Sequence, residues 1–558
     1  MRGFPEIIAS ADWCNVGRSQ VNINILPDGV LLEIFAHYVD EAKWMGAWCK
    51  LVHVCRTWRL LVFSSSRRLN LQIICTARSP VRALDIWPAY PIVILGRYLH
   101  RALPSGMDNI ISALKHHDRV RHIELRDPGS LLLGIFAAEI QEPLPELTVL
   151  ELRLGGIRAA PVLPDSFSIG PQPRLQKLHL RGIPLLPVRK LLLSAIDLIY
   201  LDLWDIPYCE YTSDGAMITC LAAMTRLESL SLGFCFPRSG PASRRPPPPT
   251  HIVFPALTHF KFRGVSETLE DLVVRIDTPL LDKAEITFFN QLLYEMPGLL
   301  QFIGRANKFK VFDQAHVLFQ HRYVQVGLSS QASTVDHGTI ELRILCQESD
   351  WQLSSLAQVC HWLPPYSTIE RLDIREDSRP YCRTHWQDDL DNTQWTELFR
   401  PFTAVKDLHL SEEPVLRVAL ALQEPFGAEV LPVLQNIFLE VPESSDLVRA
   451  AAERFIAAQQ FSGHKVTVLH ALSGRVLQSF TPQVEIICRC SSILFCAVYC
   501  TEVDSFQPDL LSLVIGPIRE HIAQQFLCVV HSPLGIFPTM DHPDFVPSMA
   551  RTRLRRSG

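Results

Sequence analysis

A short unit of the form apolar-x-x-apolar-x-apolar recurs along most of the chain and constrains the fold more than any other feature. Seven copies follow one another, starting at Val120, Leu147, Leu175, Leu198, Leu227, Leu257 and Leu281. After a stretch without clear register, three more copies start at Ile369, Val405 and Leu434. The alternating end of the unit is typical of a short β-strand whose apolar side chains enter a shared core. The pattern therefore predicts a series of similar strands.

The spacing of the copies indicates what kind of array they build. The first seven starts are 27, 28, 23, 29, 30 and 24 residues apart, which is the period of leucine-rich repeats and slightly beyond it. The 40 prolines among 558 residues exceed the ~5% of an average chain and argue against an all-helical bundle. We therefore predict an α/β fold in which residues 120–475 form an irregular leucine-rich-repeat-like solenoid. A conventional α/β domain with leucine-rich strands is the alternative.

The solenoid should be irregular, because the Asn or Cys that usually follows the last leucine of a repeat is mostly missing and only Cys235 matches. The non-leucine positions of the strands should line one open face, with members such as Glu151, His179, Asp202 and Lys261. Arginine and aromatic side chains dominate the energetics of protein interfaces. We predict that this face binds a protein through Arg181, Tyr200 and Trp204. The alternative is that most of these positions are merely solvated.

The N-terminal region has a helical pattern instead. Proline and aspartate in Leu26-Pro27-Asp28 favour a helix start. Val30, Ile34 and Tyr38 then recur every four residues, with Leu31, Phe35 and Val39 beside them. A second helix is predicted from a stripe at helical spacing, which consists of Trp48, Leu51, Val52, Cys55, Arg59 and Val62. Both helices are apolar on two faces, so one face should pack internally and the other needs a partner or the next domain. An ordinary buried helical cap is the alternative.

The sequence of this region, LPDGVLLEIF followed by LVHVCRTWRLLV, resembles an F-box over Ile25 to Leu69. The segment from Ser64 to Ile94 is similar to the one that follows the box in fungal F-box proteins. The resemblance implies a three-helix F-box domain over residues 24–70 that docks onto a Skp-type adaptor and, through it, a cullin complex. It implies adaptor contacts at Leu26, Pro27, Leu31, Ile34, Phe35, Val54, Cys55 and Trp58. The linker Asp40–Gly46 is longer than in the simplest F-boxes.

By this resemblance the chain is expected to be a substrate-recognition adaptor of an SCF-type ubiquitin ligase. The repeat face, with Arg181, Tyr200 and Trp204, would then bind an unknown substrate protein destined for ubiquitin-dependent degradation. The chain should not be an enzyme and should need no cofactor, because phosphate-binding glycine loops and hydrolase motifs are absent from its sequence. An interaction scaffold acting outside any ubiquitin ligase is the alternative. An enzyme hidden in the repeats is the rival of a different class.

The charge and the composition of the chain limit the classes of partner that we expect it to bind. The 53 basic and 58 acidic side chains nearly cancel, leaving a net charge of −5, so we expect no nucleic-acid partner. No signal-peptide pattern and no bilayer-length apolar stretch is found, so we expect no membrane partner and an intracellular location, cytoplasmic or nuclear. Most of the 15 cysteines lie in apolar runs and are predicted to be free thiols.

The sequence contains two groups of possible zinc ligands, and neither predicts a metal site. One is Cys382, His385, Asp388 and Asp389; the other is Cys488, Cys490, Cys496 and Cys500, whose spacing is not that of a zinc knuckle. The remaining segments are predicted to be a flexible N-terminus (1–23), a linking segment (71–119) and a poorly integrated C-terminal tail (476–558). The proline-rich stretch Pro237–Pro255 is predicted to be an exposed loop, either passive or a ligand for a proline-binding domain.

Overall fold

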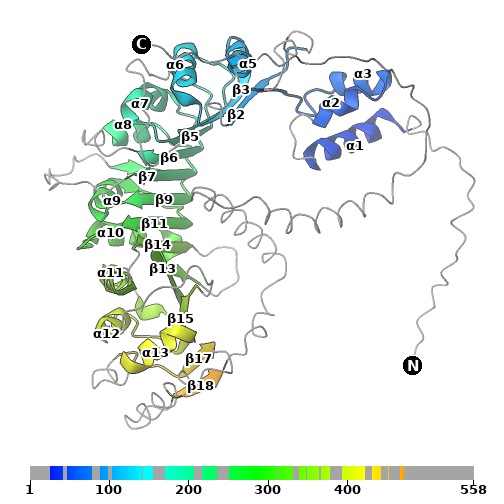
Figure 1. Cartoon of the computed structure of the whole chain (residues 1–558). Helices are drawn as coiled ribbons and strands as arrows, with labels where there is room; N and C mark the ends of the chain where they lie inside the picture. The colour runs from blue at the N-terminus through cyan, green and yellow to red at the C-terminus, as the bar shows by residue number, and fades with distance from the viewer. Residues whose placement is uncertain are drawn as a thin grey trace, which may run out of the picture. The chain divides into compact units, whose positions relative to one another are not determined.

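The computed structural model describes residues 26–41, 47–77, 84, 88–97, 104–140, 143–154, 170–206, 216–235, 251–310, 312–330, 338–346, 349–362, 366–377, 393–421, 430–440, 450 and 466–470. These residues form an α/β structure with a large, mostly parallel sheet and twelve α-helices among the described parts (Figure 1). The prediction of an α/β fold is confirmed at this level.

Sixteen strands make the sheet, in the order β1-β2-β3-β4-β5-β6-β7-β9-β11-β14-β13-β12-β15-β16-β17-β18. The strands of its first half are β1 (Ile73–Thr76), β2 (Ile92–Arg97), β3 (Val120–Arg126), β4 (Val149–Arg153), β5 (Lys177–Arg181), β6 (Tyr200–Ile206), β7 (Ser229–Phe234), β9 (His259–Gly264) and β11 (Lys283–Phe289). Those of its second half are β12 (Gln314–Gln320), β13 (Tyr323–Ser329), β14 (Thr339–Leu345), β15 (Arg371–Glu376), β16 (Asp407–Ser411), β17 (Asn436–Glu440) and β18 (Thr467–His470). A separate pair is formed by β8 (Ile252–Val253) and β10 (Ile276–Asp277).

All ten copies of the repeated unit contain a strand of the sheet, so the predicted strands are confirmed. The copy that starts at Leu175 illustrates why this unit forms a strand with one buried face. Leu178 and Leu180 in β5 are 0% and 2% exposed, whereas His179 and Arg181 between and after them remain partly exposed. Successive side chains of a strand point to opposite faces. One face of the sheet is therefore a hydrophobic core and the other is polar.

Helices cover the apolar face of the sheet (Figure 1). They are α5 (Pro104–Leu114), α6 (Gly129–Glu139), α7 (Leu185–Ser194), α8 (Ala216–Ala222), α9 (Ser266–Val273), α10 (Pro297–Arg305), α11 (Ser349–Trp362), α12 (Thr393–Phe399) and α13 (Glu412–Ala421). Large aromatic side chains join the two layers: Phe260 of β9 contacts Phe302 of α10 with ring centroids 5.6 Å apart, and both are 1% exposed. Among the residues that the structure describes, these helices lie on one side of the sheet and leave the opposite face open.

The sheet differs from the predicted array in two places. It begins at β1, so the segment 71–119, expected to be only linking, contributes β1, β2 and α5. The unclear register after Leu281 reflects a meander. Here β14 takes the place beside β11, β13 runs antiparallel to both of its neighbours, and β12 pairs with β15. Two residues, His321 and Arg322, connect β12 to β13, and so short a connection permits only an antiparallel pair.

Three helices form the N-terminal unit: α1 (Asp28–Glu41), α2 (Ala47–Val52) and α3 (Arg56–Ser64). The single second helix predicted from the stripe between Trp48 and Val62 is therefore wrong, because the chain breaks before α3. Cys55 is extended there, and its Sγ accepts a hydrogen bond from the backbone N–H of Trp58 at 3.4 Å. The cysteine thus acts as the N-cap that starts α3.

The three helices have a hydrophobic core of their own, centred on Phe35, Trp48, Val52 and Val62. Phe35 is 0% exposed and lies 4.6 Å from Trp58, measured between ring centroids. The indole N–H of Trp48 donates to the backbone oxygen of Gln72 at 2.9 Å, immediately before β1. The unit is therefore tied to the start of the sheet by a hydrogen bond as well as by the chain.

Several predictions fall on residues outside the described ranges. These are the N-terminus 1–23, the tail 476–558, both groups of possible zinc ligands and most of the proline-rich stretch. The end of that stretch is described and differs from an exposed loop, because it forms β8 and buries Phe254. Among the helices that are described, none combines the length and apolar composition that crossing a bilayer requires.

Candidate functional site

The open face of the sheet presents its side chains in rows, because parallel strands in register place equivalent residues side by side. An N-terminal row consists of His122, Val149, Lys177, Tyr200, Ser229, His259 and Lys283. A middle row consists of Glu124, Glu151, His179, Asp202, Ser231, Lys261 and Glu285. An arginine row includes Arg126, Arg153, Arg181 and Trp204, and continues on β9 with Arg263. The predicted grouping of these positions on one face is confirmed.

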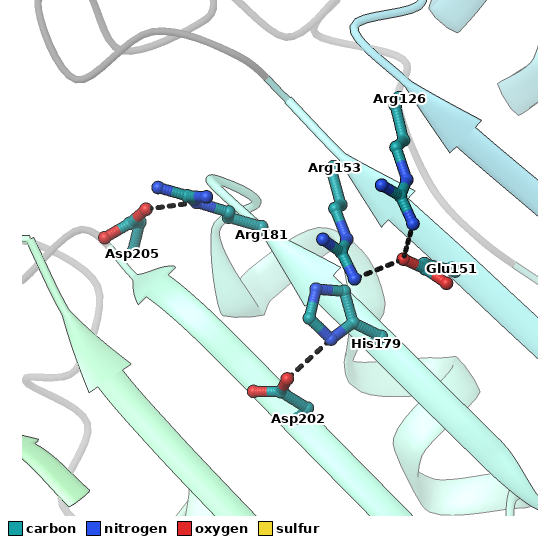
Figure 2. A network of polar contacts seen from close by, with 7 residues as sticks. All are labelled: Arg126, Glu151, Arg153, His179, Arg181, Asp202 and Asp205. Atoms are coloured by element: carbon teal, nitrogen blue, oxygen red, sulfur yellow. Dashed lines mark hydrogen bonds and ion pairs between the residues drawn. The ribbon is translucent and has the colours of Figure 1, made fainter. Parts of the chain in front are cut away.

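Ion pairs connect the side chains of these rows into a network. Its first part joins the arginine row to the middle row (Figure 2). Arg153 Nη2 lies 2.5 Å from Glu151 Oε1, and Arg126 Nη2 lies 3.5 Å from the same oxygen. Arg126 also contacts Glu124 through its Nε, at 2.8 Å. Neighbouring arginines would repel each other, so a carboxylate shared between them offsets the cost of placing them on adjacent strands.

The second part is centred on Asp205, which follows Trp204 in β6. Its Oδ2 lies 2.6 Å from Arg181 Nε, and its Oδ1 lies 3.7 Å from Arg263 Nη1. Asp205 has a φ of +54°, in the left-handed region that non-glycine residues rarely adopt. The register between β6 and β7 shifts at this point. The irregular backbone gives two consecutive side chains, Trp204 and Asp205, partial access to solvent, where a regular strand would bury one of them.

The indole ring of Trp204 packs closely against Gly233 of β7, which has no side chain to displace it. A Cβ atom added at Gly233 would lie 2.5 to 2.9 Å from three atoms of the indole ring. Two cations flank the ring, with Lys261 Nζ 5.5 Å and the Arg263 guanidinium carbon 6.0 Å from its centroid. Cation–π attraction and contact with the glycine together hold the indole in one orientation. Trp204 is thus a partly exposed aromatic side chain whose orientation is fixed by its neighbours.

The three predicted substrate-binding residues are not all brought together. Arg181 and Trp204 are paired in register on β5 and β6 and lie side by side. Tyr200 is on the same face but pairs with Lys177 at the other end of β6, roughly 13 Å along the strand. It is 37% exposed, and burial together with the charge of Asp202 raises the pKa of its hydroxyl.

Histidines occupy the same face. His179 Nδ1 lies 2.5 Å from Asp202 Oδ2 (Figure 2). The pKa of His122 is lowered, because burial disfavours its charged form more than the nearby Glu124 and Glu151 favour it. His122 is therefore neutral near pH 7 and adds no charge to the face.

A third carboxylate, Glu285 of β11, is held by two lysines. Lys283 Nζ lies 2.5 Å from its Oε1 and Lys261 Nζ lies 2.9 Å from its Oε2. Burial alone would raise the pKa of Glu285, but the hydrogen bonds and charges of the two lysines outweigh it and lower the pKa to about 2.

This lowered pKa predicts a loss of stability in acid. Because the folded pKa of about 2 lies below the value of about 4.3 in an unfolded chain, the contribution of Glu285 is complete above about pH 5 and disappears as the pH falls to about 2. Urea unfolding between these pH values should show the stability advantage of the wild type over Glu285→Gln shrinking toward zero. A difference that does not change with pH would contradict the assignment.

The predicted adaptor-binding residues divide into three groups. Leu26, Pro27, Ile34 and Val54 are exposed, with Ile34 at 42% and Val54 at 58%. Leu31 and Phe35 are 2% and 0% exposed, so they belong to the core of the three helices and present no surface. Cys55 and Trp58 are partly buried, the first as the N-cap of α3 and the second against Phe35.

Two residues that the predicted contact set omitted lie on the exposed side of α1. Val30 and Tyr38 are 44% and 36% exposed and lie one turn before and one turn after Ile34. We call Val30, Ile34 and Tyr38 the α1 row. Their four-residue spacing was visible in the sequence, and the burial of the neighbouring stripe shows which of the two stripes faces solvent. On the sheet, the predicted binding residues omitted Asp205 and Gly233. Neither the alternation of apolar and polar residues nor any sequence motif indicates a role for these two positions.

No protein-family model matches the chain, and no curated protein has significant sequence similarity to it. The assignment of function therefore depends on the residues and the geometry described above.

Proposed function

We propose that this protein is a substrate-recognition adaptor of an SCF-type ubiquitin ligase. In this proposal the three N-terminal helices are an F-box that binds a Skp-type adaptor, and through it a cullin complex. The region from β1 to β18 is an irregular leucine-rich-repeat-like solenoid whose open face binds a substrate protein. Ubiquitin transfer is carried out by other subunits, and this chain contributes proximity and orientation without bond chemistry of its own. Such a role places the chain in the cytoplasm or nucleus.

The observation that carries the adaptor role is the α1 row. Single exposed apolar residues are normal on protein surfaces, but three on successive turns of one helix form a continuous apolar strip. The strip begins directly after Leu26 and Pro27, which are also exposed and belong to the sequence that resembles an F-box. The other side of α1 is occupied by the core around Phe35, so the strip is left for a partner.

Two features support the repeat assignment. Strands and helices alternate along most of the chain, and each strand from β3 to β6 pairs with the strand that follows it. Every such unit buries its leucines against the next one, which is how repeat proteins build a continuous core. The open polar face that results contains Arg and Trp side chains, the residue types found most often at binding hot spots.

Co-purification of the full chain with a Skp-type adaptor tests the proposal. We expect saturable binding by the wild type, and at least a tenfold loss in Val30→Ala/Ile34→Ala because each buried interface anchor contributes about 1–2 kcal/mol. The matched control is Leu292→Ala/Leu293→Ala, which removes two equally apolar side chains, 75% and 68% exposed, from the segment before α10.

The control variant should bind the adaptor like the wild type. If the folded wild-type chain fails to bind the adaptor, the ligase role is wrong. If binding survives the Val30→Ala/Ile34→Ala substitutions at full strength, the helices dock through a surface other than the α1 row.

A further inference from the structure

The open face is richer in cations than the chain as a whole. The three rows together with Asp205 contain seven cationic side chains, Arg126, Arg153, Lys177, Arg181, Lys261, Arg263 and Lys283. They contain five carboxylates, Glu124, Glu151, Asp202, Asp205 and Glu285. The full chain has the opposite balance, with a net charge of −5. With seven cations and five carboxylates, this part of the face has a net charge of +2, opposite in sign to that of the chain.

Three of the carboxylates are each shared between two cations. Glu151 contacts Arg126 and Arg153, while Asp205 contacts Arg181 and Arg263. Glu285 contacts two lysines in the same way. Because Arg126 also pairs with Glu124, its cluster has two carboxylates for two arginines, whereas at Asp205 and at Glu285 one carboxylate lies between two cations. The pairs keep the cations in place but leave a positive potential that favours an incoming anion.

The cations remain accessible to a ligand. The side chains of Arg153 and Arg181 are 35% and 34% exposed, and Lys261 is 45% exposed. Arg153, Arg181 and Trp204 stand on three consecutive strands in register, about 4.8 Å apart from one strand to the next. A guanidinium group presents a planar set of donors that matches a carboxylate. Neighbouring side chains of a bound peptide can therefore contact two arginines and the indole ring.

We propose that these five residues, Arg153, Arg181, Trp204, Lys261 and Arg263, form a cationic patch that binds an acidic peptide segment of the partner protein. The segment supplies Asp and Glu carboxylates to the arginines and an apolar side chain to the exposed part of the Trp204 ring. The inference rests on the proposed function in one respect, since the protein that contains the segment is the substrate to be ubiquitinated.

Fluorescence anisotropy with labelled synthetic peptides and the full chain tests the patch directly. The probes are an Asp/Glu-rich peptide with one central leucine, the same peptide with Lys at every acidic position, and the same peptide with phosphoserine at those positions. The Asp/Glu peptide should bind saturably and more weakly as salt is raised, because partly exposed charges are screened. The Lys peptide should not bind.

Arg153→Gln/Arg181→Gln should weaken binding of the acidic peptide by at least tenfold, the effect of about 1.4 kcal/mol. Arg174→Gln/Arg226→Gln is the matched control, because these arginines form comparable single ion pairs with Glu146 and Asp197 outside the patch. Arg153→Lys/Arg181→Lys keeps the charge and should retain part of the affinity, which separates a charge effect from loss of folding. Thermal unfolding of all the variants provides the check on the fold.

Three results would overturn the proposal: equal binding of the Lys peptide, unchanged binding by the Arg153→Gln/Arg181→Gln variant, or binding of the phosphoserine peptide alone. The last would assign the patch to phosphorylated segments instead. Because no adaptor is present in this experiment, its outcome is independent of the adaptor co-purification. If the chain binds the acidic peptide but no Skp-type adaptor, the proposed patch is supported and the proposed ligase role is wrong.

Discussion

Replacing Phe35 with alanine is expected to lower the free energy of unfolding of the three-helix unit by about 3–5 kcal/mol. The ring is 0% exposed and packs against Trp58, so its removal leaves a cavity in the core of the three helices. Hydrogen exchange over α1 to α3 measures the effect locally, because the amides of these helices should lose protection while those of the sheet keep theirs.

Ile34→Ala, one residue earlier in the same helix, is the matched control. Ile34 is 42% exposed, so its truncation should change stability by no more than about 0.5 kcal/mol. Under the proposed adaptor role, both variants should weaken binding of the Skp-type adaptor, Phe35→Ala through unfolding and Ile34→Ala with the helices intact. Equal loss of amide protection in the two would show that α1 faces the core differently from the arrangement described here.

The second large effect is expected in the sheet. Phe260→Ala should destabilise the region around β9 by about 3–5 kcal/mol, since it removes a ring that is 1% exposed and leaves a cavity against Phe302. Urea unfolding of the full chain, followed by far-UV circular dichroism, should show a lower midpoint for the transition of the sheet.

Lys261, the next residue in β9, provides the control for Phe260→Ala. Lys261 lies on the opposite face, with a side chain 45% exposed and an ion pair to Glu285. Lys261→Ala should cost less than about 1 kcal/mol, the usual limit for an exposed pair. If Lys261→Ala were the more destabilising of the two, the assignment of the buried and open faces would be reversed.

The sequence predicted the strands and their faces because both depend on local alternation. In copies such as the one at Leu175, the leucines have to be inside and the intervening residues outside whatever the strand pairs with. Pairing order is not local. The meander of β12, β13 and β14 involves contacts between strands more than 50 residues apart, and nothing in the alternation of β12 distinguishes it from a strand that adds to β11.

The N-terminal helices show the same limit. The spacing correctly placed α1, but it could not decide between the stripe of Val30 and Ile34 and the stripe of Leu31 and Phe35, since both are apolar. That choice depends on the position of Trp48 and Trp58, which come from other helices. The break before α3 was missed because cysteine is an unusual N-cap.

On the open face, Arg181 and Trp204 were predicted from alternation and residue type, whereas the residue that organises them was not. Asp205 falls at a position that a regular strand would bury, and it reaches Arg181 and Arg263 only because its backbone is left-handed. Gly233 has no side chain from which a role could be predicted, yet the indole ring of Trp204 occupies the space that a side chain would fill.

The reversed order of β14, β13 and β12 has a consequence for synthesis on the ribosome. Strands β3 to β7 each emerge next to the strand they join, so the nascent sheet can grow as it is made. Growth then stops at β11, whose partner β14 ends at Leu345, 56 residues after Phe289. At translation rates of about 5–20 residues per second, the edge of β11 stays uncovered for roughly three to ten seconds. During that interval the nascent chain presents an unpaired strand edge, where premature association with other chains and binding of chaperones should be concentrated.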